Sequence, residues 1–207
     1  MLKRAVYLIL FLFISISAGA QINSYLGGNI QGNYSWIRGD EPTFSVGYGA
    51  GVSYIYWEYE YWFIKAGIEY HHKTSSILDY SDIYGVPPLE PEDKIRINYT
   101  EDAIGIPLTF YFRPYERGKN ALLLSGTLEP MVVASLKADS EEYGELVLPA
   151  SGARTVVKSN VAFGLGYQRQ IDKYKFLNLV AAYTMDVRGT PSYNSITLTV
   201  EFIFGVY

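Results

Sequence analysis

The last fourteen residues of the chain, 194–207, alternate between apolar and polar side chains almost without interruption. The apolar parity holds Ile196, Leu198, Val200, Phe202, Phe204 and Val206. The other parity holds Thr197, Thr199, Glu201, Ile203 and Gly205. An extended strand sends alternate side chains to opposite faces, whereas a helix would scatter the apolar residues around its circumference. This stretch is therefore predicted to be a strand whose apolar face must be covered by a protein core or by lipid.

Seven further segments alternate in the same way, so eight strands are expected in the whole chain. They cover residues 22–36, 43–57, 61–74, part of 95–112, 121–136, 155–170, 176–188 and 194–207. Pro107 lies inside the fourth strand and lacks the N–H that a sheet ladder needs, so a bulge is predicted there. In the fifth strand the expected apolar face consists of Leu122, Leu124, Leu128, Val132 and Leu136, opposite Ser125, Thr127, Glu129 and Ser135.

The lengths of the strands and their connections favour lipid over a protein core. The expected strands run for about 12 to 16 residues, against about 5 or 6 in soluble sheets. Short turns at 58–60, 113–120 and 171–175 alternate with long acidic loops at 75–94 and 137–154. Outer-membrane barrels have short periplasmic turns and longer external loops. The fold class predicted is all-β, an eight-stranded antiparallel up-and-down transmembrane β-barrel.

Aromatic residues gather where the strands meet the short turns. This group contains Tyr54, Tyr56, Trp57, Tyr59, Tyr61, Trp62, Tyr111, Phe112, Tyr115, Tyr167, Tyr174, Phe176 and Tyr207. Membrane barrels carry aromatic girdles at the lipid interface, so the group is expected to form one rim. A thinner group is expected at the other rim, made of Tyr34, Trp36, Phe44 and Tyr70.

The polar parity of each strand then faces the barrel interior. An eight-stranded barrel is only wide enough inside to be filled by side chains. The inward set carries both signs of charge: Lys65, Glu69, Lys73, Glu129, Lys158, Asp186, Arg188 and Glu201. These residues predict a plug of ion pairs and hydrogen bonds rather than the lining of a pore.

Residues 1–20 are expected to be a cleaved secretory signal, leaving residues 21–207 as the barrel domain. Lys3 and Arg4 precede an apolar run of about a dozen residues, which is too short to span a bilayer, and small residues follow at positions 18–20. Removing these two of the 17 basic residues leaves 15 against 21 acidic ones, so the formal charge falls from −4 to −6. An acidic exported chain is not expected to bind nucleic acid. It also has no cysteine, so it forms no disulfide and carries no lipoprotein anchor.

Three short motifs resemble a known family. The expected signal ends in Ala20-Gln21, the fourth strand contains Ile104-Gly105-Ile106-Pro107-Leu108, and the sixth contains Gly-rich residues 161–167. In these features the chain resembles the PorT-like small outer-membrane β-barrel proteins of Bacteroidota, over essentially its whole mature length. The resemblance implies an outer-membrane location and a barrel. It does not imply one biochemical activity for all members, although one lineage of the family serves protein secretion. The terminal aromatic departs from the usual assembly signal, because Tyr207 has the opposite parity to Phe202 and Phe204.

Few residues suggest chemistry. His71 and His72 point to opposite faces of a strand, so they cannot both bind one metal ion. Ser75, Ser76 and Glu69 lie near His71 in sequence, but no nucleophile motif surrounds them. The long loops carry a set of acids that could hold Ca²⁺ or bridge it to lipopolysaccharide, although the spacing fits a solvated loop better. These acids are Asp79, Asp82, Glu90, Glu92, Asp93, Asp139, Glu141, Glu142 and Glu145.

The sequence thus predicts a monomeric, non-enzymatic barrel in the outer membrane of a Gram-negative cell, with no catalytic, cofactor or metal site. The expected partners are outer-membrane lipid and lipopolysaccharide, the barrel assembly machinery during insertion, and a protein bound at the external loops. The role is structural or binding, with an accessory part in protein secretion as one version. The alternatives are a narrow porin-like channel, a rim-sited lipid-modifying enzyme, and a soluble barrel that binds an apolar ligand inside.

Overall fold

The computed structural model describes residues 24–37, 44–79, 95–140, 144–145, 157–188 and 193–206. The expected signal segment, Tyr207 and most of the two long acidic loops lie outside these residues. Within the described part of the chain, no helix is long and apolar enough to cross a membrane.

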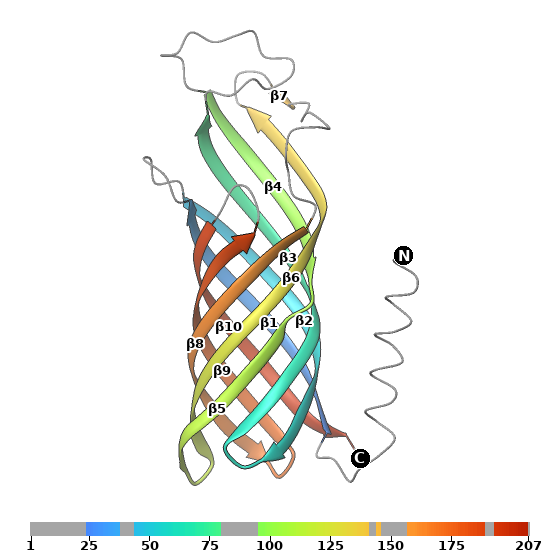
Figure 1. Ribbon diagram of the computed structural model, residues 1–207, viewed down its shortest axis with the longest axis vertical. Coiled ribbons are helices and arrows are strands. Elements are labelled where there is room, and N and C mark those ends of the chain that lie inside the picture. Colours follow the sequence, from blue (N-terminus) through green and yellow to red (C-terminus); the bar gives the residue numbers. More distant parts are fainter. Residues whose placement is uncertain are drawn as a thin grey trace.

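The described residues form strands that close into a ring (Figure 1). The strands are β1 (Ser24–Ile37), β2 (Phe44–Tyr59), β3 (Trp62–Asp79), β4 (Ile95–Gly105), β5 (Leu108–Arg117), β6 (Asn120–Ser140), β7 (Gly144–Glu145), β8 (Val157–Asp172), β9 (Lys175–Arg188) and β10 (Tyr193–Val206). Neighbours along the chain pair antiparallel, and β1 pairs with β10 to close the ring. β4 and β5 share one position in the wall, because each lies between β3 and β6. β7 pairs only with β6, so the wall has eight positions and the predicted eight-stranded barrel is confirmed.

The break between β4 and β5 falls at Ile106 and Pro107, where a bulge was predicted. Pro107 cannot donate to the ladder, and the strand is interrupted there rather than merely bulged. Two backbone hydrogen bonds tie the break to both neighbours. Gly67 N donates to Pro107 O at 3.1 Å, and Ile106 N donates to Pro130 O at 2.9 Å. The wall therefore stays closed although the strand does not continue.

The outer surface of the ring is apolar around its circumference. The predicted outward residues are exposed on strand after strand, with Val52 at 67%, Ile68 at 60%, Phe163 at 60% and Leu198 at 62%. A closed barrel has no second sheet to cover such a surface, and lipid is the solvent that suits it. The chain is therefore a transmembrane β-barrel.

Three details of the wall differ from the predictions. β3 continues to Asp79 and β6 to Ser140, so strands occupy the first residues of the loops predicted at 75–94 and 137–154. The turn expected over residues 113–120 is much shorter, because β5 continues to Arg117 and only Gly118 and Lys119 turn, with Gly118 at φ 62°. Leu136 does not face outward. The register between β4 and β6 shifts between Asp102 and Ala103, so Ser135 pairs with Asp102 and Leu136 pairs with Glu101 on the inner face. A bulge of this kind exchanges the two faces of a strand.

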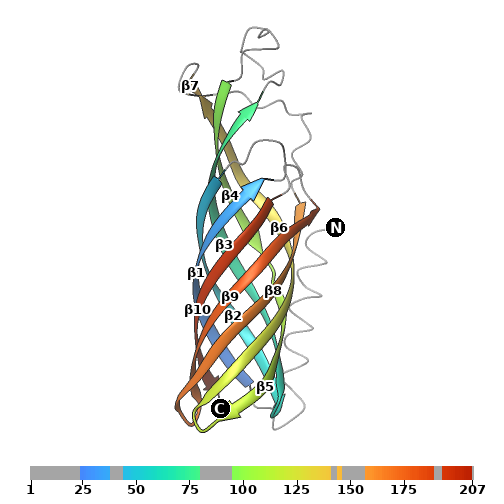
Figure 2. The same ribbon diagram turned by 90° about the vertical axis from the view of Figure 1, so that its left-hand side faces the viewer.

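The two ends of the barrel are built differently (Figures 1 and 2). We call the end with the turns at residues 60–61, 118–119 and 173–174 the turn end, and the opposite one the loop end. β1 begins and β10 finishes at the turn end, where Ser24 pairs with Val206. At the loop end β3, β4 and β6 run beyond the other strands, and their outward side chains become polar: Arg96, Asn98, Thr100, Lys137 and Asp139.

A charge placed on the outer surface tests the lipid-facing assignment. Val200 lies near the middle of β10 and points outward. Val200→Arg is expected to lower the free energy of unfolding in liposomes by about 2–4 kcal/mol, because arginine at the bilayer midplane is poorly solvated. Urea titration followed by tryptophan fluorescence measures the change. Thr100→Arg, on the polar extension at the loop end, is the matched control and should change little. Equal effects of both substitutions would contradict the assignment.

Candidate functional site

The buried polar and charged side chains of the described residues are concentrated in the interior of the barrel. From the turn end to the loop end it contains an aromatic plug, a first ionic network, a cavity and a second ionic network. Each layer is made by the inward parity of several strands, so residues far apart in sequence meet across a narrow lumen.

The aromatic plug closes the turn end from inside. Its buried members are Tyr25, Ile55, Trp57, Phe63, Tyr111, Leu123, Phe176, Val180 and Ile203. Ring centroids lie 4.8 Å apart in the pair Trp57–Phe63 and 4.6 Å apart in the pair Phe63–Tyr111. Such offset contacts are favourable beyond the area that they bury.

The plug corrects part of the predicted girdle. Trp57, Tyr111 and Phe176 were assigned to the lipid interface, but they are 8%, 3% and 6% exposed and lie in the lumen. Their parity is the inward one, and each strand turns its side chains alternately inward and outward wherever it lies. Outward aromatics remain at this end, among them Tyr61, Phe112 and Tyr115. The turn end thus has aromatic residues on both surfaces of the wall.

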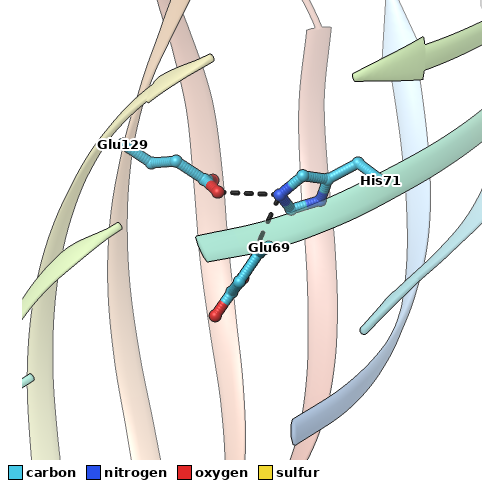
Figure 3. Close-up of side chains that lie close together, drawn as sticks. All are labelled: Glu69, His71 and Glu129. Carbon is cyan, nitrogen blue, oxygen red and sulfur yellow. Dashed lines mark hydrogen bonds and ion pairs between the residues drawn. The ribbon is translucent and has the colours of Figure 1, made fainter. Parts of the chain in front are cut away.

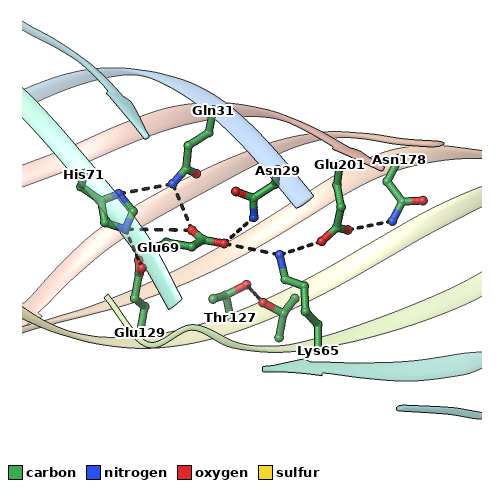
Figure 4. A network of polar contacts seen from close by, with 10 residues as sticks. Asn29, Gln31, Lys65, Glu69, His71, Thr127, Glu129, Asn178 and Glu201 are labelled. Carbon is green, nitrogen blue, oxygen red and sulfur yellow. Dashed lines mark hydrogen bonds and ion pairs between the residues drawn. The ribbon is translucent and has the colours of Figure 1, made fainter. Parts of the chain in front are cut away.

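The first ionic network lies directly above the plug and is centred on Lys65 (Figure 4). The Lys65 ammonium is 3.1 Å from Glu201 Oε1 and 3.6 Å from Glu69 Oε1, and all three side chains are nearly inaccessible. Amide groups also bind these two carboxylates. Asn29 Nδ2 donates to Glu69 Oε1 at 2.6 Å, and Asn178 Nδ2 donates to Glu201 Oε2 at 3.0 Å. These ion pairs and hydrogen bonds offset part of the cost of burying the charges.

His71 on β3 joins this network to Glu129 on β6, two positions along the wall (Figure 3). His71 Nε2 lies 2.7 Å from Glu129 Oε1 and 4.0 Å from Glu69 Oε2. Its other ring nitrogen, Nδ1, is 3.3 Å from Gln31 Nε2, which also donates to Glu69 Oε2 at 3.0 Å. Because an amide nitrogen only donates, Nδ1 accepts and Nε2 carries the proton toward Glu129.

A cavity of about 120 Å³ opens above these groups, and polar side chains from both walls line it. A second ionic network borders the same cavity. Lys158 Nζ donates to Glu101 Oε2 at 2.5 Å. The ammonium of Lys73 lies 3.3 Å from the centroid of the Tyr193 ring, and Tyr193 N donates to Asp186 Oδ2 at 3.0 Å. Tyr193 thus contacts Lys73 through its ring and Asp186 through its backbone N–H.

The predicted inward set of charges is confirmed for seven of its members. Lys65, Glu69, Glu129, Lys158 and Glu201 are buried in the lumen, and Lys73 and Asp186 line the cavity. The side chain of Arg188 lies outside what the structure describes. The charged residues therefore fill the lumen with ion pairs and hydrogen bonds, as the sequence predicted.

Several polar members of the interior were not predicted as site residues. These are Asn29, Gln31, Glu101, Gln168 and Asn178. Parity places four of them on the polar face of their strands, so this signal could have identified them. Glu101 is different because the alternation of its strand is clear only after Ile104.

The structure separates the residues of the predicted enzymatic alternative. Ser75 Oγ lies 3.1 Å from the hydroxyl of Tyr193, while His71 binds Gln31 and Glu129. His72 faces outward, as expected from strand geometry, and its Nδ1 is 2.8 Å from Asp102 Oδ1. Ser75 and His71 thus do not form a nucleophile and base pair.

The predicted acidic loops are tested only at their edges. Asp139 is exposed on β6, and Asn98 Nδ2 donates to it at 3.5 Å. The side chains of Asp79 and Glu145 and the whole of Asp82, Glu90, Glu92, Asp93, Glu141 and Glu142 lie outside the described residues. The prediction of solvated acidic loops without a calcium site therefore stays untested.

Solved structures of similar shape are small barrels of bacterial outer membranes. Neisserial surface protein A is 12% identical, with 88% of this chain and 97% of that chain covered and a TM-score of 0.49. Ail, the attachment invasion locus protein of Yersinia pestis, is 12% identical, with 89% and 100% covered and a TM-score of 0.42. OprG from Pseudomonas aeruginosa is 10% identical, with 90% and 95% covered and a TM-score of 0.43. No family model and no curated protein matches the chain.

The location of the protein follows from its own surfaces. Its ring has an apolar exterior and a charged, filled interior, the opposite of a soluble ligand-binding barrel. Single-chain barrels with this inside-out pattern are proteins of the bacterial outer membrane. The chain is therefore an integral outer-membrane β-barrel.

The buried lysine offers a test of the first ionic network. Lys65→Met keeps the length of the side chain but leaves Glu69 and Glu201 without their cation. The expected loss is about 3–5 kcal/mol of the free energy of unfolding, because an unpaired buried charge is costly. Urea titration of the protein in detergent micelles measures it. Adding Glu201→Gln to Lys65→Met should restore part of the loss, whereas two additive losses would show that the pair is not coupled.

Proposed function

We propose that this outer-membrane barrel is non-conducting and non-enzymatic, and that it acts in the cell envelope by binding a partner at its loop end. The closed lumen is the observation that carries the proposal. The aromatic plug fills the turn end, and the ion pairs of Lys65 and Lys158 cross the interior above it. A transport path through the lumen would have to break these contacts. We therefore assign the function of the protein to its external surface.

The loop end provides a surface suited to binding. β3, β4 and β6 project beyond the ring, with Asp79 paired to Ile95 and Ile97 paired to Ser140. Their inner face is packed, since Ile97 and Ala138 are nearly inaccessible. Their outer face mixes Arg96 and Lys137 with polar and acidic side chains, which suits a headgroup of lipopolysaccharide or the polar surface of a protein.

A narrower version of the proposal is an accessory role in protein secretion. The resemblance to the PorT-like family supports it, because one lineage of that family serves secretion. The element that carries the resemblance most specifically, residues 104–108, lies at the break between β4 and β5. The motif therefore has a structural role in the wall. It supports a relationship to the family, but it does not point to any one partner.

Conductance separates this proposal from the porin-like alternative. The wild-type protein in planar bilayers is expected to give no current above that of protein-free lipid, because the plug blocks the turn end. Removing three of its rings with Trp57→Ala, Phe63→Ala and Phe176→Ala opens only the turn end, so a measurable path is expected when Lys65→Ala and Lys158→Ala are added to remove the ion pairs, in protein that still inserts. Steady conductance of the wild type would contradict a closed lumen.

Site-directed crosslinking tests the binding surface. A photo-reactive amino acid at Asn98, on the outer face of the extension, should give a discrete adduct in intact cells, identified by mass spectrometry as lipopolysaccharide or one protein. The same probe at Lys119, in the exposed turn at the other end, is the matched control and should give no such adduct. Absence of any adduct at Asn98 would contradict a partner at the loop end and leave a purely structural role.

A further inference from the structure

We propose that Glu69, His71 and Glu129 form a binding site for one divalent transition-metal ion of the zinc class, held inside the barrel. Each residue offers one ligand atom, and these three atoms lie within 4.8 Å of one another. One imidazole nitrogen with two carboxylate oxygens is a donor set that suits Zn²⁺. The sequence predicted no metal site, because the two carboxylates lie on different strands and only the register brings them to one histidine.

The charges around the three residues do not balance without a further cation. The described first ionic network has one ammonium, that of Lys65, and three carboxylates: Glu69 and Glu201 pair with Lys65, while Glu129 contacts His71. With His71 neutral the cluster therefore carries a net charge of −2. Among the side chains that the structure describes, the second network contains two lysines, Lys73 and Lys158, and two carboxylates, Glu101 and Asp186, whose charges cancel. The excess sits at His71, in a lumen where buried charge is costly.

A divalent ion supplies the charge that is missing. Bound by neutral His71 and both carboxylates, it would bring the first network to a net charge of zero. A calcium ion has the same charge but needs about six to eight oxygen ligands, which this cluster does not offer. The cavity of about 120 Å³ borders all three side chains, so it has space for the ion and for water at the open coordination positions. Sites with three protein ligands and an open position are common for zinc.

Glycines make the space in which the carboxylates converge. Glu69 pairs across the strands with Gly51 on one side and with Gly105 on the other. A Cβ at Gly51 would lie 2.4 Å from Glu69 Cγ, and one at Gly105 would lie 2.1 Å from Glu129 Oε1. The Glu69 side chain thus packs against the backbone of Gly51, and the Glu129 carboxylate packs against that of Gly105. Neither glycine has a side chain that would keep the two carboxylates away from His71 (Figure 3).

Metal binding requires a small rearrangement at His71. Without metal the Nε2 proton points to Glu129, and Nδ1 accepts from Gln31. Zinc would take the Nε2 lone pair of the other neutral tautomer, in which Nδ1 carries the proton. The Gln31 amide then turns over, so that its oxygen accepts from Nδ1, the usual outer-shell bond of a metal-bound histidine. The proton on Nε2 is lost to water in the cavity and Nδ1 takes one up, so the imidazole stays neutral overall. Gln31 gives up its hydrogen bond to Glu69 Oε2, and that oxygen becomes free to bind the ion.

The experiment is a zinc titration of the full-length protein purified in detergent and stripped with a chelator. Isothermal titration calorimetry should give one equivalent of Zn²⁺ and no binding of Ca²⁺. His71→Gln and Glu129→Gln should each weaken the site by more than about 100-fold, the upper end of the loss caused by outer-shell changes. The matched control is His72→Gln, which alters the adjacent outward histidine and should leave the affinity unchanged. The folded band in cold SDS verifies each variant.

Two further measurements keep the test decisive. Gly105→Ala retains every ligand but displaces the Glu129 carboxylate, so it should weaken zinc binding by about tenfold, an effect of the outer-shell kind. X-ray absorption of the zinc-loaded wild type should show nitrogen and oxygen ligands at about 2.0–2.1 Å with imidazole scattering, which His71→Gln removes. Failure of the wild type to take up zinc, or equal affinity of His71→Gln, would overturn the site. The outcome is independent of any partner at the loop end.

Discussion

Closure of the ring by β1 and β10 is the constraint on which every other feature of this molecule depends. Once Ser24 pairs with Val206 and the ladder runs to Tyr193, the wall has no free edge, and its backbone groups are satisfied between neighbouring strands. Each side chain is then left with one of two environments, lipid or lumen. Alternation along the chain becomes alternation across the wall, and this is why a sequence of near-zero mean hydropathy can produce a membrane protein.

The lumen divides into an apolar part and ionic parts because the two cannot share one layer. The plug around Phe63 gains from ring contacts and needs no water, whereas Lys65 needs Glu69 and Glu201 within reach. Placing the rings at the turn end keeps water from reaching the network from that side. Low accessibility strengthens each ion pair, but it equally raises the cost of any charge without a partner. The number of positive and negative side chains in the ionic part of the lumen is therefore tightly constrained.

Parity, which is local, allowed most of the wall to be predicted from the sequence. It placed Leu198 outside and Glu201 inside correctly. Trp57 also has the inward parity, and it lies inside although its place beside a turn is typical of residues at a lipid interface. The prediction for Leu136 was wrong, since the bulge before it arises from pairing between β4 and β6. The meeting of His71 with Glu129 depends on the stagger of strands around the ring, and one sequence contains no direct signal for that.

The contact between His71 and Glu129 also lies where the wall is least continuous. Glu69 pairs with Gly105, the last residue of β4, and Ile106 donates to the carbonyl of Pro130, next to Glu129. The interruption between β4 and β5 thus lies at the height of the cluster, in the strand position between β3 and β6. The 2.7 Å contact from His71 to Glu129 joins these two strands through the lumen instead. Because β3 and β6 also carry the loop-end extension, a bridge between their side chains would hold the base of the external surface in place across the break in the strand between them.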